Sequence, residues 1–325
     1  MRQVLVTGAT GFTGGHLARK LIQKGYAVTC LAREGRETGE LEKFGCRVVR
    51  GDLTRPDTLN TAVRGVHTVY HVAALYREEN VSRRLFWDVN VGGTRSLLEA
   101  SLEAGVKRFV HCSTVGVQGE ILNPPATEEA PYNPGDHYQE SKMEGERLAL
   151  DCCRMKGLSV VVFRPVGIYG PGDKRFLKLF RYVKFGMFGS GEVLYHLTYI
   201  DDLTDGILLT GTVPGIEGHI FTLAGDRYTT LNELFRTIAE VLDVPPSTRH
   251  YPVWPVYAAG AMCEWVCKPF RVPPPIYRRR VDFFIKDRAF DIGKARSMLG
   301  YQPRIDLRTG IARTAEWYKQ QGMLK

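Results

Sequence analysis

VLVTGATGFTG, residues 4–14, is the stretch of sequence from which the fold follows. Its first three residues are apolar and typical of a buried β-strand. Gly8, Gly11 and Gly14 come next, at intervals of three residues. Apolar residues then recur at helical spacing, and a second apolar strand pattern occupies residues 27–31. A strand, a glycine-rich turn, a helix and another strand in this order predict a βαβ unit.

The glycine spacing indicates a nucleotide-binding turn. Gly8 permits a tight turn, Gly11 lets backbone amides approach a pyrophosphate, and Gly14 lets the following helix pack close to the sheet. Phe12 and Thr13 belong to the same turn, at the start of the helix, where free backbone N–H groups attract an anion. Glycines also make ordinary turns, so the evidence for a nucleotide is the position of this turn between a strand and a helix.

The composition is that of a globular protein. Of 325 residues, 44% are hydrophobic and 24% charged, which fits one large domain or two closely joined ones. The net charge of +9 suggests affinity for phosphorylated small molecules or polyanions. The basic residues are scattered, however, and the densest run, Arg278–Arg280, is soon followed by Asp282. An anion pocket or a solvated face is therefore favoured over a nucleic-acid surface.

The cysteines and the most apolar segment argue against a disulfide-linked, a metal-binding or a membrane-inserted protein. None of the seven cysteines forms a CxxC pair, and Cys263 and Cys267 lack a matching set of nearby ligands. Reduced thiols, no metal site and a cytoplasmic location are expected. The start of the chain has no signal-peptide pattern, which agrees with that location. The segment from Val253 to Cys267 is too short to span a bilayer, so no membrane insertion is expected.

A YxxxK pair, Tyr138 and Lys142, supplies candidate catalytic groups. The surrounding apolar periodicity predicts a helix that begins near these residues, so the two side chains share one face. A phenol is a poor base at neutral pH, but a nearby ammonium favours the phenolate. Tyr138 could then exchange a proton with a secondary alcohol or ketone while a hydride moves to or from a nicotinamide.

The motifs occur in the order typical of one family. They are TGATGFTG at 7–14, GDL at 51–53, HVAA at 71–74, NVGGT at 90–94, YxxxK at 138–142, RPVGIYGP at 164–171 and YIDDL at 199–203. In these motifs the chain resembles the extended short-chain dehydrogenase/reductase family. That family groups nucleotide-sugar epimerases and dehydratases with steroid- and flavonol-type reductases.

The resemblance implies an α/β fold, a doubly wound parallel Rossmann sheet with a smaller, interleaved C-terminal substrate domain. We expect the Rossmann domain to comprise residues 1–171, with 197–224 and parts of 291–325 returning to it. The substrate domain is then built from residues 172–196 and 225–290. Family members commonly form homodimers through a four-helix interface, to which helices near 90–104 and 138–156 would contribute here.

The resemblance also assigns individual residues. The expected cofactor contacts are Asp52 and Leu53 at the adenine, Ala73 and Ala74 at the ribose, and Pro165, Val166 and Ile168 near the nicotinamide. Lys142 would also hold the nicotinamide ribose. Asn90 would support a water relay, although an asparagine that pins a helix is equally compatible. Alignment of residues 117–119 with the family's VYG places Thr114 at the catalytic Ser/Thr position. Ser113 is the alternative, because adjacent residues at a strand end point to opposite faces.

The end of the second strand favours NADP(H), with NAD(H) possible. An acidic residue there would bind the ribose 2′-hydroxyl of NAD, whereas an arginine suits the 2′-phosphate of NADP. The sequence reads LAREGR over residues 31–36, so no Asp ends the strand. Arg33 falls where the flavonol-reductase branch places its phosphate-binding arginine, and Arg36 could assist. The alternative is that Arg33 is an ordinary surface residue.

Two departures from the family pattern narrow the reaction. The 4,6-dehydratases carry Asp-Glu after the catalytic Thr, where this chain has Val115-Gly116, so dehydration is not expected. Sugar-nucleotide epimerases often place a diphosphate-binding Arg seven residues before the Asp of the DLxDG segment, and this chain has Tyr195 there. Arg280 lies near a second phosphate-binding position, so Tyr195 and Arg280 are the candidate substrate contacts. The apolar segment 251–270 is expected to pack the core of the small domain, or else to line an apolar pocket.

These observations predict an NAD(P)-dependent oxidoreductase that transfers hydride at a secondary alcohol or ketone, with a small-molecule substrate. One form is a nucleotide-sugar epimerase or 4-keto-sugar reductase. Another is an NADP-dependent dehydrogenase or reductase of an apolar, steroid- or flavonol-like substrate. A remote alternative is a non-catalytic NAD(P)-binding sensor, which the complete Tyr138, Lys142 and Thr114 set argues against.

Overall fold

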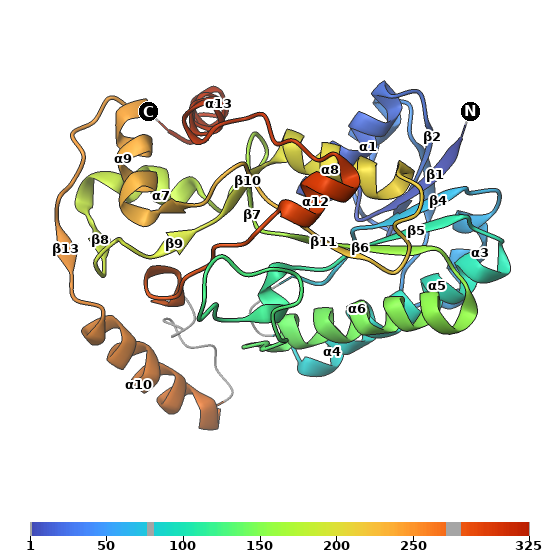
Figure 1. Ribbon diagram of the computed structural model, residues 1–325, viewed down its shortest axis with the longest axis horizontal. Helices are drawn as coiled ribbons and strands as arrows, with labels where there is room; N and C mark the ends of the chain where they lie inside the picture. The colour runs from blue at the N-terminus through green and yellow to red at the C-terminus, as the bar shows by residue number, and fades with distance from the viewer. Residues whose placement is uncertain (1, 77–80, 271–280, 325) are drawn as a thin grey trace.

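A seven-stranded parallel sheet forms the centre of the molecule in the computed structural model, which describes residues 2–76, 81–270 and 281–324 (Figure 1). Its strand order is β11-β6-β5-β4-β1-β2-β3. The strands are β1 (Gln3–Thr7), β2 (Ala27–Ala32), β3 (Arg47–Arg50), β4 (Thr68–His71), β5 (Arg108–Cys112), β6 (Val160–Pro165) and β11 (Ile220–Leu223). All neighbouring pairs are parallel. The predicted doubly wound Rossmann sheet is confirmed.

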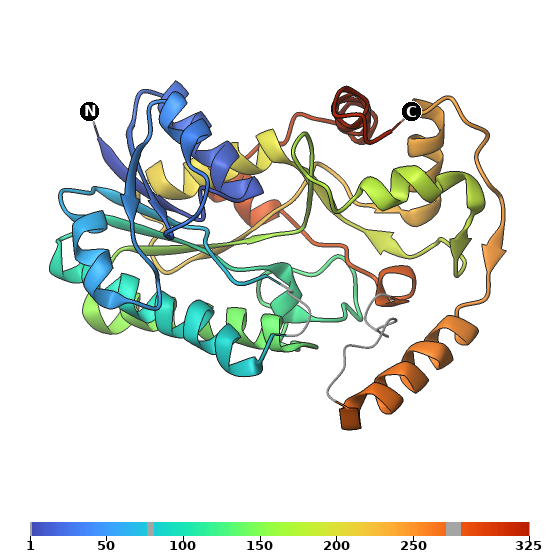
Figure 2. The ribbon, with the colours of Figure 1, turned by 180° about the vertical axis from the view of Figure 1, so that it is seen from behind.

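Helices cover both faces of this sheet (Figures 1 and 2). One face carries α1 (Phe12–Gln23) and α8 (Ile200–Thr212), with α12 (Gly293–Leu299) beside α8. The other carries α3 (Leu59–Val63), α5 (Gly93–Glu103) and α6 (His137–Lys156). Shorter helical segments are α2 (Gly39–Lys43), η1 (Pro56–Thr58), α4 (Arg83–Trp87), the π-helical η2 (Asp88–Gly92) and η3 (Val115–Gln118).

The alternation of side chains along β1 explains why a layer of helices covers each face of the sheet. Val4 and Val6 are fully buried in one apolar cluster with Leu17 of α1. Leu5, between them, is fully buried in a second cluster with Leu97 of α5. Successive side chains of a strand point to opposite faces, so a continuous apolar strand requires cover on both sides.

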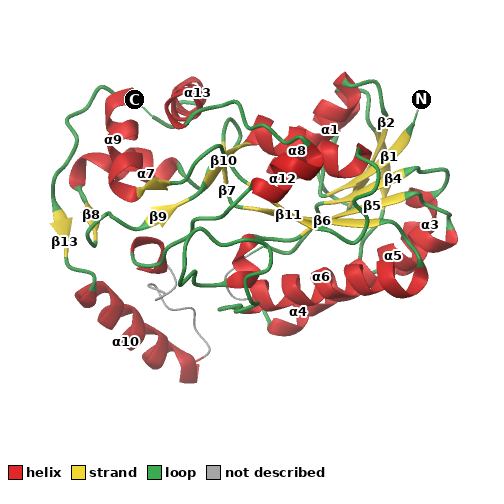
Figure 3. Cartoon of the chain, viewed as in Figure 1, coloured by secondary structure: helices red, strands yellow, loops and turns green. Residues whose placement is uncertain are grey.

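A smaller group of elements lies beyond one end of the sheet, as the mostly short strands and helices of Figure 3 show. It contains α7 (Leu177–Tyr182), η4 (Val183–Phe185), β8 (Met187–Phe188), β9 (Leu194–Tyr195), β12 (Thr229–Thr230), α9 (Leu231–Val241), β13 (His250–Tyr251), α10 (Trp254–Phe270) and η5 (Asp282–Phe284). β7 (Gly167–Tyr169) and β10 (Leu197–Tyr199) pair in parallel between this group and the sheet. α13 (Leu307–Gln320) packs against α9. The predicted domain boundaries stay a prediction.

The expectation that residues 251–270 pack a core is wrong. Trp254 and Trp265 of α10 are 73% and 77% exposed, and Tyr257 is 41% exposed. The alternative expectation, a pocket wall, is not met either, because the described residues of α10 do not line the large cavity described below. Apolar composition predicted burial, but within the part of the chain that the structure describes no other segment covers this face of the helix.

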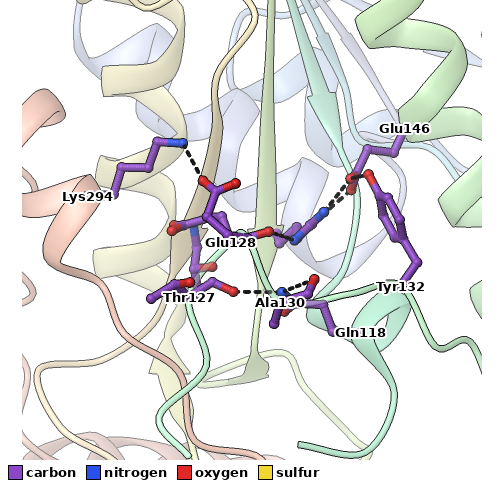
Figure 4. Close-up of polar contacts among 10 residues, drawn as sticks. Gln118, Thr127, Glu128, Ala130, Tyr132, Glu146 and Lys294 are labelled. Atoms are coloured by element: carbon purple, nitrogen blue, oxygen red, sulfur yellow. Dashed lines mark hydrogen bonds and ion pairs between the residues drawn. The ribbon is translucent and has the colours of Figure 1, made fainter.

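A buried ion pair connects α6 to the sheet. The guanidinium of Arg164 on β6 donates from Nε to Oε2 of Glu146 at 3.0 Å and from Nη2 to Oε1 at 2.6 Å. The two side chains are only 1% and 0% exposed. The Tyr132 hydroxyl donates to the same carboxylate at 2.7 Å (Figure 4). Such a bidentate, hydrogen-bonded pair is the geometry in which burial of two charges is tolerated.

The same arginine holds the loop between η3 and α6. Its Nη1 donates to the carbonyl oxygen of Glu128 at 3.0 Å, and the Glu128 carboxylate accepts from the backbone N–H of Thr222 on β11 at 2.6 Å. Gln118 donates to the carbonyl oxygen of Thr127 at 2.7 Å within this loop (Figure 4). The loop is thereby fixed across β6 and β11, next to the start of α6.

We expect Glu146→Ala to destabilise the fold by about 3–5 kcal/mol, because it leaves the Arg164 charge buried and unpaired. The matched control is Glu144→Ala, which removes an exposed carboxylate of the same helix, 3.0 Å from Arg147, and should change stability by no more than about 0.5 kcal/mol. Urea unfolding of both variants measures the difference. Equal effects would show that the buried pair does not stabilise the structure.

Candidate active site

A cavity of about 860 Å³ runs along the carboxyl ends of the central strands. The strand order reverses between β1 and β4, and parallel α/β sheets bind ligands at such a switch point. The cavity is lined by nearly all the predicted residues: Gly8, Gly11, Phe12, Thr13, Gly14, Arg33, Arg36, Asp52, Leu53, Ala73, Ala74, Ser113, Thr114, Tyr138, Lys142, Pro165, Val166, Ile168 and Tyr195. Asn90 is not among them, and Arg280 lies outside the described residues.

The glycine turn has no room for side chains. A Cβ on Gly14 would lie 2.3 Å from the carbonyl oxygen of Gly8, and one on Gly8 would lie 2.8 Å from the backbone of Ala73. Gly8 also has a φ of +75°, which disfavours other residues. Gly11 is the N-cap of α1 and provides no side-chain cap. The first backbone N–H groups of α1 therefore face the cavity in the manner of an anion site, which fits a dinucleotide pyrophosphate.

A buried histidine fixes the neighbouring loop. His71, at the end of β4, contacts the Thr7 hydroxyl at 2.8 Å and the Thr94 hydroxyl at 3.0 Å. The Thr7 hydroxyl in turn accepts from the backbone N–H of Ala73 at 3.1 Å. Burial lowers the pKa of His71 to about 3, so its imidazole is neutral. This network sets the distance between the turn after β1 and the loop after β4.

Tyr138 and Lys142 lie in the first turns of α6. The helix begins after Asp136, whose carboxylate accepts from the backbone N–H of Gln139 at 2.8 Å. Tyr138 is 8% and Lys142 2% exposed, although both line the cavity. Burial lowers the pKa of Lys142. The spacing of four residues places both side chains on the cavity side of the helix, as predicted.

Two hydroxyls from the end of β5 reach the same cavity. The Thr114 hydroxyl accepts from the backbone N–H of Gly116 at 3.1 Å, so its own hydrogen stays available for a substrate oxygen. Ser113 is 2% exposed, and its hydroxyl has no hydrogen-bond partner among the described residues. Both hydroxyls can act as donors there, and the assignment of the catalytic role to Thr114 stays a prediction.

Asn90 lies behind the cavity wall, in the π-helical segment η2. Its Oδ1 accepts from the backbone N–H of Leu75 at 2.8 Å, and its Nδ2 donates to the Leu75 carbonyl at 3.1 Å. Nδ2 also donates to the Ser141 hydroxyl at 2.9 Å. This is the pinning arrangement that the sequence left open, and it ties the loop after β4 to α6. The water-relay role stays a prediction.

Tyr76, Arg175 and Phe283 are among the cavity residues that the sequence did not predict. The Tyr76 ring contacts the Tyr138 ring edge-on, with centroids 5.0 Å apart. Arg175 places its guanidinium 5.8 Å from the centre of the Tyr76 ring, and Asp173 holds it through a 2.7 Å bond to Nε. Phe283 reaches the cavity from η5. Tyr76 could have been suspected because it follows the HVAA motif, whereas no motif points to Arg175 or Phe283.

A second cavity of about 620 Å³ adjoins the first at the end of β2. Four arginines line it: Arg33, Arg36, Arg50 and Arg55. Arg50 donates to the carbonyl oxygens of Arg33 at 3.2 Å and Arg36 at 2.9 Å, and so shapes the turn that carries them. Asp52 and Glu34 also line this space. The end of the site away from Tyr138 is therefore rich in positive charge, although sequence reasoning found only two of its arginines.

The described part of the chain contains neither a candidate metal site nor a candidate membrane span. There, no group of three His, Cys, Asp or Glu side chains could hold a metal ion. None of the helices in that part combines the length and the apolar character needed to cross a bilayer.

Comparison with known proteins gives consistent matches. A sequence profile of the NAD dependent epimerase/dehydratase family matches residues 4–224. The uncharacterized protein y4nL of Sinorhizobium fredii is 31% identical, covering 98% of this chain and 96% of the relative. The sterol-4-alpha-carboxylate 3-dehydrogenase erg26, decarboxylating, of Schizosaccharomyces pombe is 29% identical, covering 98% and 97%. The crystal structure of gox2253 superposes with a TM-score of 0.85 at 28% identity, covering 100% of this chain and 99% of that one.

We expect Tyr138→Phe to reduce turnover at least about 100-fold, because it removes the hydroxyl that would exchange the proton and keeps the ring. Dinucleotide affinity should stay within about twofold, because the glycine turn is unchanged. Steady-state kinetics and fluorescence titration with the dinucleotide measure the two effects. Tyr76→Phe, which changes the neighbouring ring in the same way, is the control. Retained turnover in Tyr138→Phe would exclude Tyr138 as the proton-transfer residue.

Proposed function

The chain belongs to the NAD-dependent epimerase/dehydratase family, and within that family we propose that it is a net dehydrogenase or reductase acting on a secondary alcohol or ketone of a largely apolar substrate. Membership makes it an oxidoreductase-type protein with a dinucleotide-binding Rossmann fold. The substrate class and the direction of the reaction are the proposed part.

The aromatic wall of the cavity next to Tyr138 carries this proposal. Tyr195 occupies the position at which sugar-nucleotide epimerases often place an arginine, and its ring lies edge-on to Phe283 with centroids 4.9 Å apart. Tyr76, which contacts Tyr138, lines the same cavity, as do Phe176 and aliphatic Leu179. A wall of rings binds a fused or bulky apolar body well and provides few hydrogen bonds to sugar hydroxyls.

One of the relatives also supports an apolar substrate. The erg26 protein, which aligns over 97% of its own length, is described as a sterol dehydrogenase. A 3-hydroxysteroid has the features that this cavity calls for, a secondary alcohol on a rigid apolar body. We therefore take sterol-like alcohols and ketones as the first substrates to test.

A dinucleotide held at the glycine turn and by Lys142 would supply the hydride transfer at the carbinol carbon. Tyr138 exchanges the proton of the substrate oxygen, and the Lys142 ammonium beside it favours the phenolate form. The Thr114 hydroxyl donates a hydrogen bond to the same oxygen, with Ser113 as the alternative donor. In the oxidation direction the alcohol thus loses a proton to Tyr138 and a hydride to the dinucleotide, and it becomes a ketone.

We propose NADP(H) as the preferred dinucleotide, with NAD(H) as the alternative. The support is the cluster of Arg33, Arg36, Arg50 and Arg55 at the end of β2, where a 2′-phosphate would lie. Glu34 and Asp52 in the same space could instead accept hydrogen bonds from a 2′-hydroxyl.

A nucleotide-sugar epimerase or 4-keto-sugar reductase is the second candidate. The observation that favours it is the pair of cations at the substrate end, Arg175 and Lys178, which could bind a diphosphate. A dehydratase is not proposed, because Val115 and Gly116 stand where the acid and base for water elimination would be needed. A non-catalytic sensor has the weakest support, because Tyr138 and Lys142 are both present in the cavity. The predicted homodimer through helices near 90–104 and 138–156, and the cytoplasmic location, stay predictions.

Arg33→Ala should weaken NADPH binding about 10- to 100-fold and leave NADH binding nearly unchanged, because only NADPH carries the 2′-phosphate. Fluorescence titration with both reduced dinucleotides gives the ratio. Arg47→Ala, an exposed arginine on the neighbouring strand outside both cavities, is the control. If the wild-type protein prefers NADH, or if Arg33→Ala leaves the ratio unchanged, the NADP assignment is wrong.

Two assays separate the candidate functions. With NADP⁺ or NAD⁺, a 3β-hydroxysteroid should produce a net rise in absorbance at the wavelength of the reduced dinucleotide, because net oxidation accumulates it. UDP-glucose should give neither this rise nor an epimer. Chromatography of nucleotide released from the denatured protein should find little bound dinucleotide. Near-stoichiometric bound NAD together with epimer formation would replace the proposal by the epimerase.

A further inference from the structure

Large apolar side chains are exposed together at the end of the molecule that carries α10. The side chains that we call the distal apolar surface are between 41% and 77% exposed. They are Phe185, Trp254, Tyr257, Met262, Trp265 and Val266. Phe185 belongs to it because the Tyr251 hydroxyl, just before α10, donates to the Phe185 carbonyl at 3.1 Å. Large exposed apolar patches mark contact sites rather than ordinary surface.

α10 turns its tryptophans away from the other described residues of the chain. Trp254 and Trp265 are eleven residues apart, which is three helical turns, so they lie on one side of the helix. Gly260, on the opposite side by the same periodicity, is buried. Figure 1 shows α10 projecting from β13, apart from the other helices that it labels, and Figure 2 shows the same arrangement from behind. The described chain does not cover this face.

A row of aromatic rings links this surface to the cavity. Phe283, which lines the cavity, contacts Phe284 with ring centroids 5.0 Å apart. Phe284 contacts Phe188 at 5.7 Å, and Phe188 contacts Tyr251 at 5.9 Å. Tyr251 lies three residues before the start of α10. The apolar character of the cavity therefore continues through the smaller part of the molecule to its surface.

The charge near the distal apolar surface is positive. Lys184 is exposed, with its ammonium 5.3 Å from the centre of the Phe185 ring, and Arg249 is exposed beside Gly186. The carboxylate of Asp282, in η5, is 3.2 Å from Lys286 and so is already paired. The chain as a whole carries a net charge of +9, which has the same sign. An anionic partner complements this surface, whereas a second copy of the chain would bring the same positive charge against it.

We propose that the distal apolar surface docks on an anionic lipid surface, with α10 lying in the headgroup layer. Tryptophan and tyrosine favour that layer, and interfacial helices combine an apolar face with attraction between basic residues and anionic lipids. Docking of this kind needs no helix that spans the bilayer. Docking would also bring the row of aromatic rings from Tyr251 to Phe283 close to the lipid. An apolar substrate would then pass from the lipid to the cavity along this side of the molecule. This second step rests on the proposed function, but the docking itself does not.

Vesicle flotation of the full-length protein tests the docking. Vesicles of phosphatidylcholine with phosphatidylglycerol should carry the protein upward, and phosphatidylcholine alone should carry much less. Trp254→Ser/Trp265→Ser should lower the bound fraction about 10-fold or more at the same lipid concentration. Tryptophan emission of the wild-type protein should shift to the blue when anionic vesicles are added, and the double variant should lose most of that shift. Added salt should weaken binding.

The matched control is Phe44→Ser/Met155→Ser, which removes two apolar side chains that are 40% and 76% exposed at the ends of α2 and α6. It should float like the wild type, and both double variants should bind the dinucleotide normally. The proposal is overturned if the wild type does not float with anionic vesicles, or if the control loses binding as much as the tryptophan variant. It is also overturned if sedimentation shows a dimer that requires Trp254 and Trp265. All these readouts are independent of the substrate assays, so failure of the proposed function leaves the docking result intact.

Discussion

The crowded contact between two loops at the carboxyl edge of the sheet is the constraint on which the site depends. The turn after β1 approaches its own helix and the loop after β4 so closely that a Cβ on Gly14 or Gly8 would lie 2.3 Å or 2.8 Å from backbone atoms. Thr7 and His71 hold the same two loops from inside the sheet, through side chains that are completely buried or nearly so. Close approach brings the free N–H groups of α1 to the cavity, and this position determines where a dinucleotide would lie.

The helix that carries Tyr138 and Lys142 is positioned by a different interaction. The bond between Arg164 and Glu146 crosses from the sheet to α6, one turn beyond Lys142. Asn90 fixes the same helix through Ser141 from the other side. These polar contacts are directional, so they fix the orientation of α6 in a way that apolar packing alone would not. They also explain how Lys142 can be 2% exposed and still face the cavity.

The cavity combines two environments of different physical character. Its far end is rich in arginine and open to solvent, which suits the phosphates of a dinucleotide. The end beside Tyr138 is aromatic, and this apolar character continues outward through Phe283 and Phe284. The smaller part of the molecule thereby contributes both a wall of the site and the exposed face of α10.

The sequence by itself determined the features that depend on neighbouring residues. The glycine turn follows from a spacing of three, and the shared face of Tyr138 and Lys142 follows from a spacing of four on a helix. Arg33 was identified because it follows the second predicted strand, at the position where the flavonol-reductase branch of the family that the chain resembles places an arginine. Only the tertiary structure brought in Arg175 and Phe283, which come from distant segments and have no local pattern. The tertiary structure also determined that the tryptophans of α10 are exposed. Hydrophobic composition measures the tendency of a side chain to leave water, but whether it does so within the chain depends on whether another segment covers it, and here none of the described residues covers Trp254 or Trp265.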